Sequence, residues 1–132
     1  MKKSTVITEI ENVILRWNDT RIEDGDFGAR AFLYRGNEFG HIHKDGDLDI
    51  VFGKQLTAEL LRKKLVQKHL YVPDVGVTYE VSSEEKIPFA VSLLRFSYLI
   101  HFIHANENDT YAQNIFEAEL AKLPESLSAV YL

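Results

Sequence analysis

The residues best suited to chemistry stand in one short segment, G-N-E-F-G-H-I-H-K-D-G-D-L-D, which spans positions 36–49. Its histidines, His41 and His43, are two positions apart, a spacing that turns both side chains to one face of a strand. Two such imidazoles can bind a divalent metal, with zinc as the first candidate, or exchange protons near neutral pH. They can also be ordinary side chains at the edge of a core. The pattern leaves three interpretations open: a metal site, a metal-free polar pocket and a structural role.

Further polar groups for such a site lie elsewhere in the chain. His69 follows leucines at positions 61 and 65 at helical spacing, so it is expected to share their core-facing stripe. Arg95 lies in the most apolar stretch of the sequence, where a charge must reach solvent or find a partner, and it could hold an anionic group. We therefore expect His41, His43, His69 and Arg95 to meet in a pocket between sheet and helices.

A sheet must position these groups, and turn signals divide residues 31–52 into three short strands. Gly-Asn at 36–37 and Asp-Gly at 45–46 are typical of two-residue hairpin loops. With such loops the histidines fall on the face that is richer in large apolar groups, and Asp49 falls on the opposite face. The histidines are then expected to point toward the helices. A bulge or a three-residue loop would shift the register by one residue and reverse both faces.

The chain as a whole predicts one α+β domain over 1–132, with helices on one face of a small antiparallel sheet. The sheet is expected to be a three-strand meander plus one strand, in the order α-β-β-β-α-β-α-α. Residues 18–28 are rich in turn formers and are expected to form a loop. The expected helices cover 4–17, 56–69, a long apolar segment to about 104, and 110–123, and the expected strands cover 31–35, 38–44, 47–52 and 77–81.

Composition narrows the classes of function. The chain has 132 residues and no cysteine, which excludes disulfides, thiolate metal sites and cysteine nucleophiles. A net charge of -5 disfavours binding to phosphate backbones, so no nucleic acid is expected. The longest apolar stretch, 88–103, is short for a bilayer and contains an arginine, so it is expected to be a buried helix with no membrane span. A cytoplasmic location is expected.

Four segments between Glu38 and Tyr98, in order, carry a family resemblance: E-F-G-H-I-H, D-I-V-F, H-L-Y-V-P-D-V-G and L-L-R-F-S-Y-L. Together they resemble an uncharacterised bacterial and fungal group labelled luciferase-family or luciferase-domain proteins, a label that does not itself imply light emission. The chain departs from that group at Leu70, where a histidine is usual, and at Val77, where a tryptophan is usual. The resemblance implies that the positions to watch are Glu38, Gly40, His41, His43, Asp49, His69, Pro73, Gly76, Arg95 and Tyr98.

Two functions follow as hypotheses. The first is a small-molecule site that binds an anionic ligand or a divalent metal such as zinc, in which His41, His43 and His69 are metal ligands or catalytic acid–base groups. The residues expected to bind the ligand are Glu38, Asp49, Arg95 and Tyr98. The second is a non-catalytic interaction module or homodimer, suggested by the lack of a complete catalytic constellation.

Overall fold

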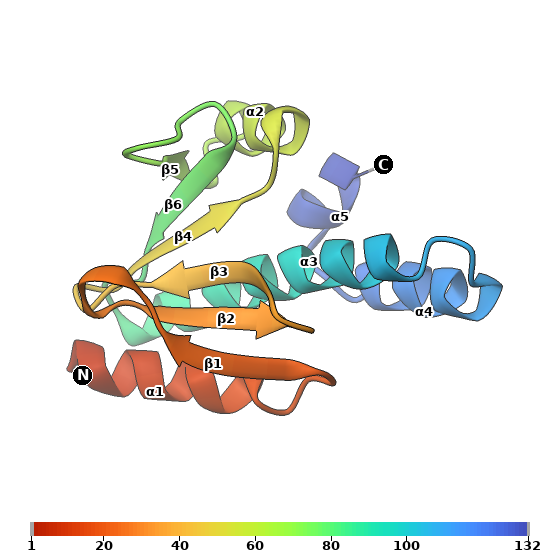
Figure 1. Ribbon diagram of the computed structural model, residues 1–132. Coiled ribbons are helices and arrows are strands. Elements are labelled where there is room, and N and C mark those ends of the chain that lie inside the picture. The colour runs from red at the N-terminus through yellow and green to blue at the C-terminus, as the bar shows by residue number, and fades with distance from the viewer. Residues whose placement is uncertain (1, 132) are drawn as a thin grey trace.

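The computed structural model describes residues 2–131 and contains one α+β domain built on a six-stranded antiparallel sheet (Figure 1). The strands are β1 (Thr20–Asp24), β2 (Arg30–Tyr34), β3 (Asn37–Ile42), β4 (Asp47–Val51), β5 (Gln67–Lys68) and β6 (Gly76–Glu80). The helices are α1 (Lys3–Ile14), α2 (Lys54–Arg62), α3 (Ile87–Ala105), α4 (Thr110–Leu120) and α5 (Glu125–Tyr131), with 3-10 turns η1 (Asp26–Gly28) and η2 (Glu84–Lys86). The strand order β1-β2-β3-β4-β6-β5 extends a four-strand meander by β6 and the short β5.

The predicted α+β class is confirmed, whereas the predicted element order is wrong in detail. Segment 18–28 was expected to be a loop, yet β1 lies within it and pairs with β2 along its full length. The expected helix 110–123 corresponds to α4, which ends at Leu120, and a further helix that was not expected, α5, follows Pro124. The expected helix 56–69 ends at Arg62, since Lys64 takes a left-handed φ of 60° that a helix cannot continue.

The long helix α3 forms the centre of the hydrophobic core. It is apolar around most of its circumference, and it packs across β2, β3 and β4 on one side and against α1 and α4 on others. Segment Glu84–Ala105 is long and apolar enough to cross a membrane by length and composition alone, but half of its apolar window is buried inside the protein, as in a core helix. Its burial confirms the prediction of a core helix.

The turn between β3 and β4 has three residues rather than two. The His43 amide donates to the Asp47 carbonyl oxygen at 2.9 Å, which leaves residues 44–46 as the loop, with Gly46 at a φ of 95°. His41 therefore lies opposite Asp49, and both side chains share one face. The predicted orientation is wrong because the longer loop moves the register by one residue, so that the histidines turn away from α3.

A β-bulge in β3 completes this change of face. Phe32 pairs with Gly40 while Leu33 pairs with Glu38, so the intervening Phe39 has no opposite residue. Gly40 faces α3, where an added Cβ would lie 2.7 Å from a Leu94 methyl carbon. The bulge thus brings Glu38 to the same face as His41, although an odd spacing would separate them in a regular strand.

Candidate functional site

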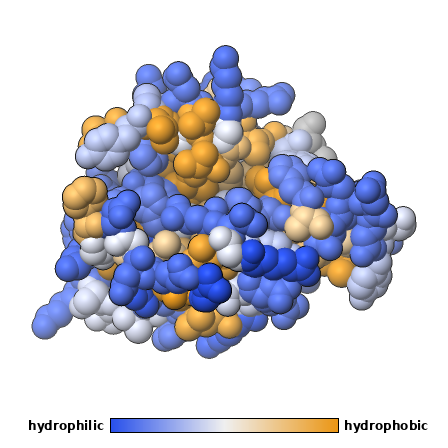
Figure 2. All heavy atoms as spheres, viewed as in Figure 1, coloured by the Kyte–Doolittle hydropathy of each residue, from blue (hydrophilic) through white to orange (hydrophobic). Residues whose placement is uncertain are grey.

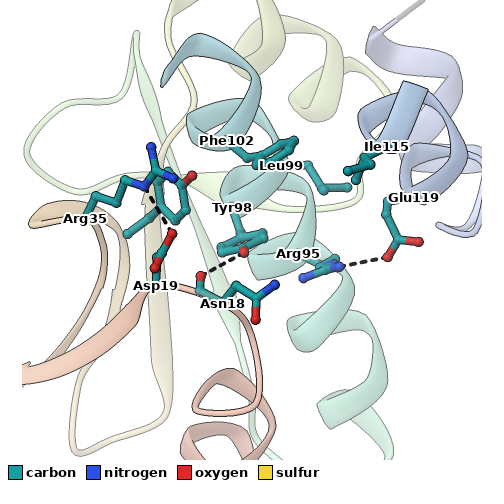
Figure 3. A pocket seen from close by; sticks show the side chains of 10 residues that line it. Asn18, Asp19, Arg35, Arg95, Tyr98, Leu99, Phe102, Ile115 and Glu119 are labelled. Carbon is teal, nitrogen blue, oxygen red and sulfur yellow. Dashed lines mark hydrogen bonds and ion pairs between the residues drawn. The ribbon is translucent and has the colours of Figure 1, made fainter. Parts of the chain in front are cut away.

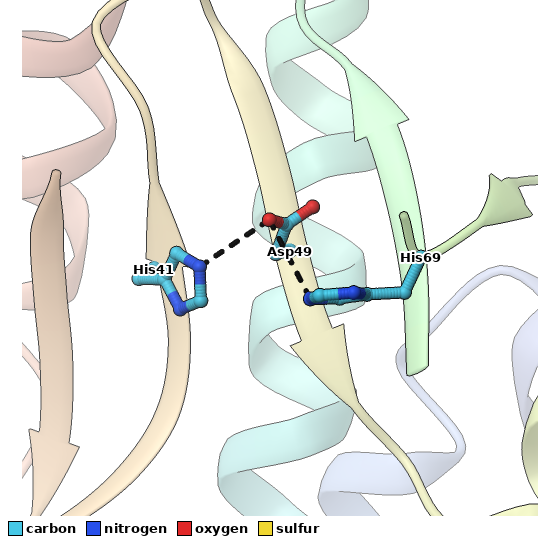
Figure 4. A group of neighbouring side chains, drawn as sticks. All are labelled: His41, Asp49 and His69. Atoms are coloured by element: carbon cyan, nitrogen blue, oxygen red, sulfur yellow. Dashed lines mark ion pairs between the residues drawn. The ribbon is translucent and has the colours of Figure 1, made fainter. Parts of the chain in front are cut away.

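The Asp49 carboxylate is the centre of a cluster of imidazoles on the sheet face opposite α3 (Figure 4). Its Oδ2 lies 2.9 Å from His43 Nε2, 3.3 Å from His41 Nε2 and 3.6 Å from His69 Nε2. Its Oδ1 accepts a hydrogen bond of 2.5 Å from the Thr78 hydroxyl. These groups come from β3, β4, β6 and the residues directly after β3 and β5, so the sheet and its turns assemble the cluster.

His41 lies between two carboxylates. Its Nε2 faces Asp49, and its Nδ1 is 2.9 Å from Glu38 Oε2. The hydrogen bond to Asp49 and then that to Glu38 raise the pKa of His41 from 6.5 to about 9, so it is an imidazolium at neutral pH. Burial alone would raise the pKa of Asp49, but hydrogen bonds from His41, Thr78 and His43 outweigh it and lower that pKa to about 2.

The backbone fixes the tautomer of His69. The amides of Tyr71 and Val72 donate to its Nδ1 at 3.1 and 3.2 Å, so Nδ1 must carry the lone pair. In the neutral ring the proton is therefore on Nε2, which points at Asp49. The buried ring packs on Gly76, where an added Cβ would come within 3.2 Å of His69 carbon atoms.

His43 differs from the other two histidines because one of its nitrogens has no hydrogen-bond partner among the described residues. An ionised carboxylate can only accept, so the contact with Asp49 assigns a proton to His43 Nε2. In the neutral ring Nδ1 then carries a lone pair, and it has no hydrogen-bond partner within residues 2–131. The side chain is 33% exposed, and it lines two hollows at the surface.

Two adjoining hollows open onto this cluster, with volumes of about 220 and 390 Å³. Both are lined by Phe27, His43, Asp49 and Tyr71. Phe27 is 98% exposed and holds a left-handed φ of 58° within η1, a conformation that costs an aromatic residue about 1 kcal/mol or more. An exposed aromatic side chain on a strained backbone, beside a polar cluster, is typical of the edge of a ligand site.

Two predicted residues do not join the histidines. Arg95 lies on α3 and its Nη2 is 2.8 Å from Glu119 Oε1, while the Tyr98 hydroxyl donates to the Asn18 carbonyl oxygen. Both line a different cavity, shown in Figure 3. The expected meeting of Arg95 with the histidines is wrong because the sheet lies between them, as the reversed register requires.

The structure brings together Glu38, His41, His43, Asp49 and His69, and it adds three residues that the sequence reasoning missed. Thr78 follows a core-facing valine on a strand, so alternation gives it the outer face once the register is known. Phe27 and Tyr71 lie in connecting segments, and no periodic signal in the sequence marks them.

A divalent metal is a poor fit to this arrangement. Single ligand atoms of His41, Asp49 and His69 lie within 4.8 Å of one another, which is close enough in distance alone. A ligating nitrogen must offer a lone pair, however, and the backbone bonds of His69 place the proton on the nitrogen that faces Asp49. The raised pKa of His41 also means that a metal ion would have to displace a proton from this ring at neutral pH. The cluster is arranged to hold protons.

The family resemblance is confirmed over residues 36–97, which match the family described as Luciferase domain. The matched segment begins at the β2–β3 turn and ends within α3, so it contains every histidine and carboxylate of the cluster. Comparisons with the curated proteins and with the solved structures found no match.

Proposed function

We propose that this protein binds a small molecule over β3 and β4 and that His43 Nδ1 removes a proton from it or from a water held beside it. The observation that carries the proposal is the contact of Asp49 Oδ2 with His43 Nε2 at 2.9 Å, which leaves Nδ1 free beside two hollows. A carboxylate that orients an imidazole in this way also stabilises the imidazolium formed when the ring takes up a proton.

The other histidines support this role through Asp49. The His41 imidazolium helps to keep the Asp49 carboxylate ionised at neutral pH, and the proton on His69 Nε2 points at the same oxygen. Thr78 holds the second oxygen and so prevents the carboxylate from turning. Catalytic side chains gain their effect from such fixed orientation, since little reorganisation is needed during the reaction.

The charges around the hollows favour a neutral or cationic ligand over an anionic one. Glu38, Asp49 and Asp26 line the smaller hollow, whereas His41 is its one cation, and Arg95 is too remote to serve. The exposed Tyr71 and the neighbouring Phe27 and Leu70 would cover an apolar part of the ligand. The substrate class is thus a small molecule with an apolar body and an ionisable O–H or C–H group.

The test uses hydrolysis of p-nitrophenyl butyrate, an activated neutral ester with an apolar chain, by the wild-type protein and the variants His43→Gln and His104→Gln. His104 is an exposed histidine at the end of α3 and serves as the matched control. We expect His43→Gln to lose tenfold or more of the rate, in the usual range for a general base. Equal rates in wild type and His43→Gln would contradict the proposal.

Metal dependence is the second arm of this test. We expect the ester hydrolysis and the melting temperature to be unchanged by a chelator and by added Zn²⁺ or Ni²⁺, because the imidazole nitrogens around Asp49 carry protons. Metal-dependent stabilisation that is lost in His41→Ala/His43→Ala would instead support a metal centre.

A homodimer or interaction module is the second candidate. Hydrophobic side chains gather in the upper middle of Figure 2, over the region of β4 and α2 in Figure 1, and Val51 at the end of β4 is 58% exposed. An apolar area of this kind is typical of association surfaces. Light scattering tests it, since a dimer that Val51→Ser converts to a monomer would support this candidate. A wild-type monomer would contradict it.

A further inference from the structure

A separate cavity of about 370 Å³ lies between the side chains of α3, α4 and two turns of the sheet (Figure 3). Its apolar walls are flat rings and branched chains, and its polar groups form two ion pairs, Arg35 with Asp19 and Arg95 with Glu119. The apolar wall residues are Tyr34, Tyr98, Leu99, Phe102 and Ile115. The volume lies within the range of small-molecule sites.

The Arg95 guanidinium is held rigidly at one end of this cavity. Its central carbon lies 5.0 Å from the centroid of the Trp17 ring and 4.8 Å from that of Tyr98. One nitrogen, Nη2, contacts Glu119, and this is the one hydrogen bond of the guanidinium within residues 2–131. The remaining N–H groups form a planar set of donors that suits a carboxylate.

Glu119 can release Arg95 without losing a partner. Its second oxygen, Oε2, lies 2.5 Å from Nζ of Lys122, which follows the end of α4. An incoming carboxylate could therefore replace Glu119 on the guanidinium, while Lys122 continues to neutralise Glu119. The arrangement resembles an occupied anion site in which the anion is a side chain of the protein.

The opposite wall carries backbone strain. Asp19 and Arg35 hold left-handed φ values of 61° and 49°, although neither is glycine. They are joined by a backbone hydrogen bond of 3.0 Å and by a side-chain ion pair of 3.1 Å. Such conformations are strained for residues other than glycine, and strain of this kind gathers at ligand-binding places.

We infer that this cavity is a second ligand site and that it binds a small planar organic acid, with the carboxylate on Arg95 and the ring against Tyr34 and Phe102. The guanidinium supplies the specific polar contact, and the aromatic walls supply the apolar contact. This inference is independent of the proton-transfer role of His43, because it shares no residue with that site.

Benzoate is the probe, and its affinity is measured by calorimetry and by the shift of the Arg95 side-chain NMR signal. We expect saturable binding to the wild type that is about tenfold tighter than the binding of acetate, since acetate lacks the ring. Glu119→Gln should bind benzoate several times more tightly, because the internal competitor is gone. Arg95→Lys should weaken binding about tenfold, since lysine lacks the planar set of donors.

Asp49→Asn is the control that separates the two sites, and benzoate should bind to it as to the wild type. If Arg95→Lys fails to fold, the opposite effect of Glu119→Gln still decides the question. Equal affinity in wild type, Arg95→Lys and Glu119→Gln would overturn the inference. So would shifts centred on His41 and His43, or the lack of saturable binding in both the wild type and Glu119→Gln.

Discussion

At the scale of single residues, the Asp49 carboxylate determines the protonation of its neighbours. It accepts from Thr78 and His43, and it contacts Nε2 of His41 while Glu38 contacts Nδ1 of the same ring. The sequence indicated which residue types form the site. It also indicated that these residues belong to one site, because most of them lie on neighbouring strands. It did not indicate that Asp49 is the centre, since the predicted register put this side chain on the other face.

Asp49→Asn tests that central role. An amide has no charge to stabilise the imidazolium, so the pKa of His41 should fall from about 9 toward its ordinary 6.5. We expect the free energy of unfolding to fall by about 1–3 kcal/mol, because buried donors lose a charged acceptor. NMR titration of the histidine rings and urea unfolding measure the two effects.

Asp47→Asn is the matched control for this substitution, because Asp47 lies two residues earlier on the same strand and face without contacting His41. The His41 titration should be unchanged in this variant. If His41 titrated equally in the Asp49→Asn variant and the wild type, Glu38 alone would set its protonation and the central role of Asp49 would be refuted.

At the scale of elements, one turn decides which face of the sheet carries the site. The sequence K-D-G at 44–46 fits a two-residue loop and a three-residue loop equally well, so local pattern could not choose. The choice comes from packing, because the longer loop places Ile42, Leu48 and Ile50 in the core under α3. β1 was missed for a related reason: only Ile22 in T-R-I-E-D is apolar, and pairing with β2 stabilises it.

Gly46→Ala tests the structural demand of this turn. Gly46 has a φ of 95°, and an added Cβ would lie 2.7 Å from the Val81 carbonyl oxygen, a backbone atom that cannot move aside easily. We expect the free energy of unfolding to fall by about 3 kcal/mol from the combined strain and clash. Urea unfolding at neutral pH measures the effect.

Gly36→Ala provides the comparison, since Gly36 has a similar φ of 85° but nothing within 4 Å of an added Cβ. Its free energy of unfolding should fall by only about 1 kcal/mol, which is the part of the loss that comes from backbone strain alone. Equal losses in the two variants would show that the contact with Val81 does not constrain the β3–β4 turn.

At the scale of the whole molecule, the sheet separates two polar regions. The histidine cluster occupies the face opposite α3, and the Arg95 cavity lies on the helical side between α3 and α4. Sequence reasoning joined them because both contain charges next to apolar residues. The fold shows that each cation is neutralised within its own region. Arg95 pairs with Glu119, and His41 pairs with Glu38 and Asp49.

The contact of His41 with Asp49 predicts how the stability of the whole protein changes with pH. The pKa of His41 is raised from 6.5 to about 9 on folding, so its contribution is complete below pH 6.5 and is lost as the pH rises through 9. The pKa of Asp49 is lowered from 3.8 to about 2, so its contribution is complete above pH 3.8 and is lost as the pH falls through 2. Burial lowers the pKa of His101, which reduces stability only below pH 6.5.

Thermal or urea unfolding between pH 3 and 10 measures this profile. We expect the free energy of unfolding to fall by about 2–3 kcal/mol between pH 6.5 and 9, a loss that corresponds to the His41 shift. His41→Gln should remove this alkaline decline, because the decline follows from the raised pKa of His41. His104→Gln should retain it. A wild-type profile that stays flat from pH 6.5 to 9 would mean that His41 is not held as an imidazolium between Glu38 and Asp49, and the assignment of protons around Asp49 would have to be reversed.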